Sequence, residues 1–234
     1  MLKDIEEFYR KTKLNAVSGS WSGKVPIEYV FTFHKEYLRF PSVKLPKGPI
    51  SGEYERLLKR RSSTRTFSNK PVPLGILAKI LGSCRIIDKD PERRTYPSAG
   101  ARFPLEIYLI AFRVKGLEPG IYHFNFSKFS LEVLLLSDLK KYETEFVSPF
   151  LKNAAGALIF TSVMSRSEVK YGLKAYPYSL LEAGHMSQNI LLSCTKHNVG
   201  ACAVGGFINN KIIELLDLTE DEIPIHVIGF GFKA

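Results

Sequence analysis

Cysteine and closely spaced histidine are scarce in this sequence. It has 3 cysteines, an odd number, and Cys84, Cys194 and Cys202 form no Cys-x-x-Cys pair. This pattern argues against a disulfide scaffold and against a thiolate zinc site. The 5 histidines show no ligand spacing such as His-x-x-x-His. The sequence therefore predicts no metal site.

Long apolar runs are also missing. The uninterrupted apolar stretches are far shorter than the roughly 18 residues that a transmembrane helix needs. The first residues, Met1–Tyr9, carry acidic side chains where a signal peptide has an apolar core. We therefore expect a cytoplasmic protein without a membrane partner.

The excess of positive charge is not concentrated in one place. Lys and Arg number 33 against 23 Asp and Glu, which gives a net charge of +10. Such a balance can indicate binding to nucleic acid or to anionic ligands. Because the basic residues are spread along the chain, we interpret them as a solvated surface and expect no nucleic-acid partner. A basic nucleic-acid-binding protein stays the weaker alternative.

The chain does have enough apolar residues for one main core. It is 234 residues long, with 45% apolar and 24% charged composition, as in ordinary soluble globular proteins. Residues 1–50 hold a short helical pattern, a Ser/Gly loop at 15–25 and a Pro-rich connection from residue 38. We interpret residues 1–50 as an N-terminal arm and residues 51–234 as the main domain.

The order of the expected elements predicts an α+β fold. Helical spacing is found at residues 2–14, 54–60, 74–84, 138–146, 176–198 and 211–216. Strand patterns are found at residues 105–112, 121–136 as a hairpin, 154–164, 200–207 and 223–232. Residues 85–95 are interpreted as a charged loop. Regular alternation of strand and helix is missing, and no Gly-x-Gly-x-x-Gly follows a strand, which argues against a doubly wound fold.

The segment Tyr96–Tyr108 joins a Pro-Ser turn and a patch of small residues to a buried strand. Ser98 can cap a helical turn with its hydroxyl group. Ala99 and Gly100 have almost no side chain, so a flat ligand could lie against the backbone there. An ordinary strand entry is the alternative interpretation of the same residues.

Three other places carry chemical groups of interest. Arg60–Arg65 combines three arginines with two serines, a set that can bind a phosphate, although a solvated charge run is the simpler interpretation. Gly205 and Gly206 can offer backbone N–H groups to a ring edge or an anion, or can form a simple turn. Lys170 and Tyr171 are possible proton carriers if burial shifts their pKa values.

Glu182 and His185 lie three residues apart within the longest expected helix, Tyr176–Asn198, so they share a face. We interpret them as a structural polar contact within an otherwise apolar stripe. The small residues of this stripe permit close approach of another element, either in the core or at a subunit interface.

Four segments, taken together and in this order, resemble the FMN-dependent nitroreductase superfamily. They are similar above all to its SagB-type dehydrogenase branch, which includes oxidases that convert azolines to azoles in ribosomal peptides. The segments are RSSTRTF (61–67), YPSAGARFPLEIYL (96–109), KYGLKAYPYSLLEAGHMSQNILL (170–192) and VGACAVGGF (199–207). The resemblance covers about residues 38–232.

The resemblance implies a mixed central sheet flanked by helices and a homodimer with FMN bound between the subunits. The cofactor-binding residues that it implies fall into three groups. The phosphate group would be held by Arg61, Ser63 and Arg65, with the backbone of Ser62 and, more loosely, Lys233. The isoalloxazine ring or ribityl chain would be lined by Pro97, Ser98, Ala99 and Gly100. The N5 side of the flavin would lie beside Val204, Gly205 and Gly206.

The same resemblance implies a catalytic pair. Lys170 and Tyr171 stand where the azoline oxidases have a Lys-Tyr pair that is thought to act in proton removal. Ala101 and Phe103 stand where many members of the superfamily have Asn and Gln, as is usual in the SagB-type branch.

These features lead to one main hypothesis with two forms. The chain is expected to be an FMN-dependent oxidoreductase that passes a hydride through flavin N5, acting on a small-molecule substrate. One form is a reductase that takes electrons from NADH or NADPH. The other is a SagB-type dehydrogenase that oxidises an azoline-like ring, with Lys170 or Tyr171 as the proton acceptor. A flavin-binding protein without turnover is the non-enzymatic alternative.

Overall fold

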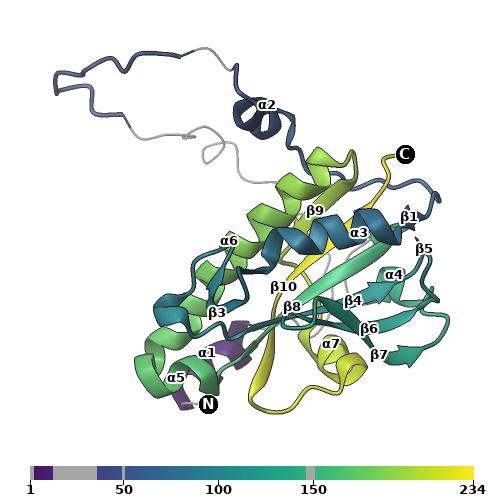
Figure 1. Cartoon of the computed structure of the whole chain (residues 1–234). Helices are drawn as coiled ribbons and strands as arrows, with labels where there is room; N and C mark the ends of the chain where they lie inside the picture. The colour runs from purple at the N-terminus through teal and green to yellow at the C-terminus, as the bar shows by residue number, and fades with distance from the viewer. Residues whose placement is uncertain (1–2, 13–35, 49–50, 146–150) are drawn as a thin grey trace, which may run out of the picture.

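The computed structural model describes residues 3–12, 36–48, 51–145 and 151–234, with the side chains of Pro91 and Thr144 excepted (Figure 1). The Ser/Gly loop expected at residues 15–25 lies outside the described residues.

A six-stranded sheet forms the centre of the molecule, with the strand order β7-β6-β4-β8-β10-β9. The strands are β4 (Leu105–Ala111), β6 (Gly120–Asn125), β7 (Ser130–Leu136), β8 (Gly156–Val163), β9 (Gly200–Val204) and β10 (Glu222–Gly231). Every neighbouring pair in this sheet is antiparallel. The α+β class is confirmed, but the sheet is not mixed among the described strands. Among the described residues, parallel pairing is found between β1 (Val72–Pro73) and β5 (Val114–Lys115), and in an isolated bridge by which Ser63 joins Ala201 of the edge strand β9.

The central strand β8 is buried on both faces, because its sequence GALIFTSV is apolar at successive positions. Leu158 and Phe160 point into one core, and Ala157 and Ile159 point into the other. Two cores on opposite faces require a layer of other elements on each side of the sheet.

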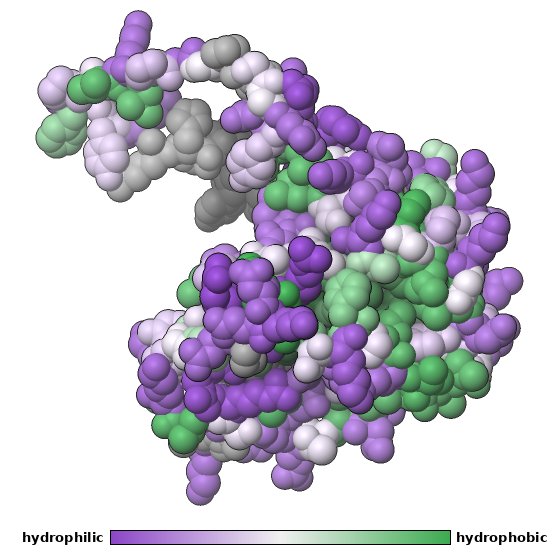
Figure 2. All heavy atoms as spheres, viewed as in Figure 1, coloured by the Kyte–Doolittle hydropathy of each residue, from purple (hydrophilic) through white to green (hydrophobic). Residues whose placement is uncertain are grey.

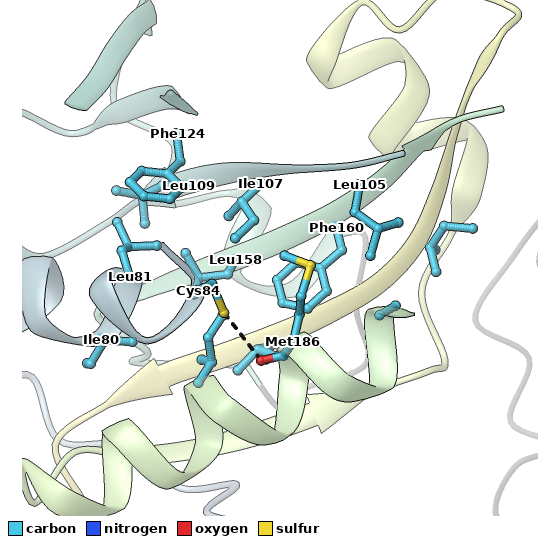
Figure 3. Close-up of a cluster of buried hydrophobic side chains, with 14 of the residues drawn as sticks. Ile80, Leu81, Cys84, Leu105, Ile107, Leu109, Phe124, Leu158, Phe160 and Met186 are labelled. Atoms are coloured by element: carbon cyan, nitrogen blue, oxygen red, sulfur yellow. Dashed lines mark hydrogen bonds between the residues drawn. The ribbon is translucent and has the colours of Figure 1, made fainter. Parts of the chain in front are cut away.

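The helices α3 (Leu74–Leu81) and α6 (Ala175–Lys196) cover the first face, and α7 (Asn209–Leu216) covers the second. Figure 3 shows Leu81, Cys84 and Met186 packed against side chains of β4 and β8. The Cys84 thiol donates to the Met186 carbonyl oxygen at 3.6 Å, and burial raises its pKa to about 12. The first core therefore fixes α6 against the sheet along its length.

The N-terminal residues include one segment that packs on the main body and one that extends away from it. Helix α1 (Lys3–Thr12) buries Ile5 and Tyr9, and the Tyr9 hydroxyl accepts from Asn209 Nδ2 at 3.0 Å, so this helix packs on the main body. Residues 36–48 have no helix or strand and extend away from the body, before α2 (Glu53–Arg60) (Figure 1). A domain boundary at residue 50 stays a prediction.

The sheet edge at β7 is apolar and exposed. Val133, Leu134, Leu135 and Leu136 are each about half exposed, and Figure 2 shows apolar residues gathered at the lower right, over β7. Among the strands that the structure describes, β7 pairs on one side only, with β6.

Some local expectations were wrong. Residues 85–95 are not a loop but a small hairpin of β2 (Ile86–Ile87) and β3 (Asp90–Arg94). The helix expected from residue 138 is limited to α4 (Tyr142–Glu145) within the described residues. A helix that the pattern missed, α5 (Ser165–Tyr171), directly precedes α6 after the short turn Gly172–Lys174. Its seven residues are too few to show a clear period.

Candidate functional site

The loop Pro97–Phe103 is held in an unusual backbone conformation. Gly100, Ala101 and Phe103 all have positive φ angles, of 56°, 52° and 45°. Such angles cost energy in residues other than glycine and persist only where surrounding contacts hold them. Ser98 supplies one of these contacts, because its hydroxyl oxygen accepts from the Phe103 N–H at 2.9 Å. The predicted helix cap by Ser98 is therefore wrong, since its side chain makes no cap bond to the turn Ala99–Ala101.

Lys170 and Tyr171 lie against this loop at Gly100. A Cβ atom placed on Gly100 would lie 2.6 Å from Lys170 Nζ and would also overlap the Tyr171 hydroxyl. Two segments that are seventy residues apart in sequence therefore meet at one glycine. Lys170 is exposed and Tyr171 is half-buried, with its ring edge-on to Tyr178 at 5.1 Å. The burial that the sequence argument required is not supplied by the described part of one chain.

Helix α5, which carries this pair, is fixed to the loop by Arg166. Its Nη1 lies 2.6 Å from a Glu106 oxygen and donates to the Phe103 carbonyl oxygen at 3.2 Å. In return, Arg102 Nε donates to the Arg166 carbonyl oxygen at 2.6 Å. These contacts stabilise the position of Lys170 and Tyr171 relative to Gly100. Sequence reasoning did not single out Arg166, because nothing in its local pattern separates it from other surface arginines.

The pairing of the strands brings this loop and Gly205-Gly206 toward the same end of the sheet. The loop enters β4 at Leu105, which pairs with Ser162 near the end of β8. Strand β9 ends at Val204, just before the two glycines, and Val204 pairs with Val227 of β10, four residues beyond Ile223, the partner of Ser162.

Gly205 and Gly206 stand in open surroundings. No described atom lies within 4 Å of a Cβ placed on either residue, and neither has a positive φ. The described chain therefore imposes no steric or conformational need for glycine at these positions. An exposed backbone of this kind can receive the edge of a flat ligand.

The cationic segment runs beside the start of β9. The Thr64 N–H donates to the Ala201 carbonyl oxygen at 2.9 Å, and the Thr64 side chain packs on Gly200. Because side chains alternate along an extended chain, Arg61, Ser63 and Arg65 share one side and Ser62 and Thr64 the other. The Arg65 charge and the Ser63 hydroxyl both lower the pKa of the Cys202 thiol against the larger effect of burial, which raises it.

A hollow of about 340 Å³ lies on the other side of this segment, lined by Arg60, Ser62, Thr64, Thr195, Asn198, Val199 and Lys233. Lys233 is thus brought to Ser62 and not to the side of Ser63 and Arg65. Arg60 Nη2 donates to Asn198 Oδ1 at 2.7 Å, so this guanidinium binds the end of α6.

The two halves of the predicted cofactor site are far apart within one chain. Ser63 bridges to Ala201, which pairs with Phe230, whereas Leu105 lies at the level of Ile223 across β8. Standard strand spacings put Ala201 and Leu105 about 23 Å apart along the strands and about 14 Å apart across them. Gly205 lies only about 13 Å along β9 from Ala201. One chain therefore joins the cationic segment to the glycine pair, but not to the loop Pro97–Gly100.

Glu182 is a buried carboxyl group directly behind the loop. It is 2% exposed, and the Ser98 hydroxyl lies 2.5 Å from its Oε2. Burial raises its pKa to about 7, against smaller opposing effects of Ser98 and Arg94. The predicted contact with His185 is wrong, because Glu182 points into the core while His185 is exposed. A charged residue in the middle of an apolar stripe was the signal for this group.

The residues present fit FMN on chemical grounds. Arginine and serine side chains beside β9 can neutralise and hydrogen-bond a phosphate. The glycine pair leaves space for a ring, because no described atom lies within 4 Å of a Cβ placed on either glycine. Among the described residues, no group of three or more His, Cys, Asp or Glu could hold a metal ion. None of the described helices is long and apolar enough to cross a membrane.

Comparison with known proteins agrees with this geometry. The model of the Nitroreductase family matches residues 58–232. The chain belongs to the nitroreductase family. A Methanocaldococcus jannaschii protein named as a nitroreductase, MJ1384, is 31% identical over 178 residues, covering 75% of this chain and 89% of that protein.

Two further matches are proteins of the microcin B17 system. The microcin B17-processing protein McbC of Escherichia coli is 26% identical over 191 residues, covering 73% of this chain and 70% of McbC. A chain of the E. coli microcin synthetase McbBCD complex, solved with truncated pro-MccB17 bound, superposes with a TM-score of 0.78 and 20% identity. That superposition covers 99% of this chain and 92% of the other, and it confirms the nitroreductase fold.

Proposed function

We propose that this protein is an FMN-dependent oxidoreductase that acts as a SagB-type dehydrogenase on an azoline-like or related ring substrate. The observation that carries the proposal is the contact of Lys170 and Tyr171 with Gly100, in the loop proposed to line the flavin. A general reductase of nitro compounds or quinones that uses NADH or NADPH needs no such pair. The relationship to McbC, a processing protein by name, supports the same choice.

The proposed division of labour follows the positions of the side chains. FMN would supply the hydride acceptor when bound. Arg61, Ser63 and Arg65 would hold its phosphate, with Ser62 and Lys233 close by, and Val204–Gly206 would lie beside the ring. Lys170, as the neutral amine, or Tyr171, as the phenolate, would take the proton that leaves the substrate as its hydride departs. Contact with a bound substrate would desolvate Lys170 and so favour its neutral, proton-accepting amine.

The separation of the two halves of the site supports a homodimer. A cofactor that extends from Ser63 along β9 to Gly205 does not reach the loop Pro97–Gly100 of the same chain, which lies beyond β10 and β8. The loop of a second copy would then complete the site. Symmetric two-fold dimers are the commonest soluble oligomers, and they would form two such sites.

A mixing experiment tests the composite site. We would combine an Arg61→Ala/Arg65→Ala variant with a Gly100→Trp variant after reversible dissociation, and measure bound FMN. Neither variant alone is expected to hold FMN. Random reassortment should restore about a quarter of the sites if each site uses both copies. No restoration, with dimers formed, would show that each site is built within one chain.

The absorption spectrum of the purified protein tests the activity itself. We expect the visible bands of oxidised flavin, slow bleaching by anaerobic NADPH, and bleaching by a peptide that contains an azoline. Lys170→Ala and Tyr171→Phe should keep the flavin bands but lose reduction by the azoline substrate. Rapid turnover with NADPH that both variants retain would favour the general reductase. A flavin that no donor reduces would favour a non-catalytic binding protein.

A further inference from the structure

The buried carboxyl group of Glu182 has no role in the reaction proposed above. Only one of its oxygens is bonded, since Oε1 is buried and has no hydrogen-bond partner among the described residues. An ionised carboxylate with an unpartnered, buried oxygen costs free energy that a neutral carboxyl group avoids. The surroundings add Arg94 from β3, Tyr96, and Cys84 from the turn Gly82–Cys84, all facing the same pocket of the core.

Arg94 does not neutralise Glu182 by direct contact. Its Nη1 donates to the Tyr96 hydroxyl at 2.7 Å, and its guanidinium carbon lies 4.2 Å from the centre of the Phe103 ring. Its Nε has no partner among the described residues. The Arg94 guanidinium therefore contacts aromatic rings and the Tyr96 hydroxyl instead of Glu182. Within the described part of the chain, Ser98 is the one hydrogen-bond partner of Glu182.

Whether Ser98 can donate a hydrogen bond to a ligand depends on whether Glu182 carries a proton. Its hydroxyl oxygen has two acceptor positions and one hydrogen. The Phe103 N–H takes one acceptor position. If Glu182 is ionised, the Ser98 hydrogen must point to Oε2, so Ser98 can only accept from a ligand. If Glu182 is neutral, its own hydrogen goes to Ser98, and the Ser98 hydrogen is free to be donated elsewhere.

We propose that Glu182 is a positioning residue whose proton sets Ser98 as a hydrogen-bond donor toward the flavin and holds the loop Ser98–Phe103 in its positive-φ conformation. This inference rests on the proposed FMN function. The flavin ring, ribityl chain and phosphate are rich in acceptor atoms, so a free hydrogen at Ser98 favours binding. Ionisation of Glu182 withdraws that hydrogen, because the Ser98 hydroxyl must then point to Oε2. Affinity for FMN is therefore expected to fall as the pH rises through the range in which Glu182 loses its proton.

The first test compares the FMN dissociation constants of wild-type apoprotein and Glu182→Gln from about pH 5.5 to 8.5, by flavin fluorescence. The glutamine amide donates to Ser98 at every pH, so this variant mimics the neutral carboxyl group. Taking the ratio of the two constants removes the titration of the FMN phosphate, which is common to both. We expect a ratio near one at low pH and roughly three- to tenfold weaker wild-type binding at high pH, the size of one hydrogen bond. A ratio that stays constant would overturn the inference.

A second comparison separates the hydrogen bond from the bare charge. The Ser98→Ala single variant and the Ser98→Ala/Glu182→Gln double variant are expected to bind FMN equally at each pH, because no hydroxyl remains to be oriented. A pH-dependent ratio that persists without the Ser98 hydroxyl would show that charge alone acts, and the positioning role would be wrong. Glu143→Gln is the matched control, since Glu143 is 5% exposed and bonded to Arg113 Nη1 at 2.7 Å on the other side of the sheet. It should lower the melting temperature and leave the FMN ratio independent of pH.

The melting temperature of the apoprotein gives a readout that needs no cofactor. Between pH 4.5 and about 7 the folded wild-type protein should hold more protons than the unfolded chain, so Glu182→Gln should change the pH dependence of melting in this window only. If no protein binds FMN, the proposed function and this role fail together. FMN binding with a constant ratio removes this role alone.

Discussion

Gly100 and the pair Gly205-Gly206 are both glycines of the candidate site, but the chain treats them in opposite ways. Gly100 has a positive φ and faces the ends of Lys170 and Tyr171. Gly205 and Gly206 have ordinary backbone angles and no described neighbour within reach of a Cβ. The first glycine is required by the fold itself. The other two are not required by anything in the described chain, so we expect a ligand or a second copy to be what requires them.

Two buried titratable groups, His226 and Glu182, are expected to change the stability of the protein with pH in opposite directions. Burial lowers the pKa of His226 to about 4, and His226 lies on β10 next to Val227, the partner of Val204. The unfolded chain therefore binds more protons between pH 6.5 and about 4, and stability is lost as the pH falls through that window. Glu182, with its pKa raised to about 7, acts in the opposite direction, since stability is lost as the pH rises from 4.5 to about 7.

The largest expected effect is thus a pair of opposed pH slopes, each at most about 1.4 kcal/mol per pH unit. His226→Gln should remove the loss of stability at low pH, and Glu182→Gln should remove the loss on the rise toward neutral pH. Urea unfolding of the apoprotein at half-unit steps from about pH 4 to 8 measures both. Parallel curves for wild type and either variant would show that the group titrates alike in the folded and unfolded chains.

The next effect concerns Gly100 itself. Gly100→Ala should lower the free energy of unfolding by roughly 1–2 kcal/mol, because a positive φ is costly for a residue with a Cβ. The overlap with Lys170 and Tyr171 adds less, since both contacts are with the ends of side chains. Gly75→Ala in α3 is the control, as no described atom lies within 4 Å of its Cβ and alanine favours a helix. Urea unfolding at neutral pH should show a loss for the first variant and none for the second.

The glycine pair should give the reverse pattern. Gly205→Ala and Gly206→Ala are expected to leave the stability of the apoprotein within about 0.5 kcal/mol, as at open surface positions. The same changes should weaken FMN binding about tenfold, or about 1.4 kcal/mol, by filling the space beside the ring. Equal losses of stability and of affinity would mean that the fold, not the ligand, requires these glycines.

The smallest expected effect tests the attachment of α5 to the loop. Arg166→Lys keeps the charge beside Glu106 but loses the planar guanidinium, whose Nη1 also donates to the Phe103 carbonyl oxygen. Because the pair is partly exposed, we expect a loss of stability of about 1 kcal/mol or less. The turnover of an azoline substrate should fall more than stability does, since Lys170 and Tyr171 lose their alignment. Unchanged turnover would separate Arg166 from the site.

Most of the elements could be predicted from the sequence because their patterns are local. Apolar alternation predicted β4 and the hairpin of β6 and β7, and a continuous apolar run predicted β8. The hairpin of β2 and β3 was missed because its charged residues hide any alternation. The antiparallel pairing of the whole sheet could not be deduced, since pairing depends on which strands meet after the chain has folded.

The sequence by itself determined the α+β class, the family and the segments that carry chemistry, because residue types and their spacing are properties of the chain. Only the tertiary structure decided how these segments meet. It brought Lys170 and Tyr171 to Gly100, and it turned Glu182 inward to Ser98. It also separated the loop Pro97–Gly100 at β4 from the cationic segment at β9 by the two strands β8 and β10. Contacts between residues far apart in sequence depend on strand order and on the packing of α6, and no local pattern records either.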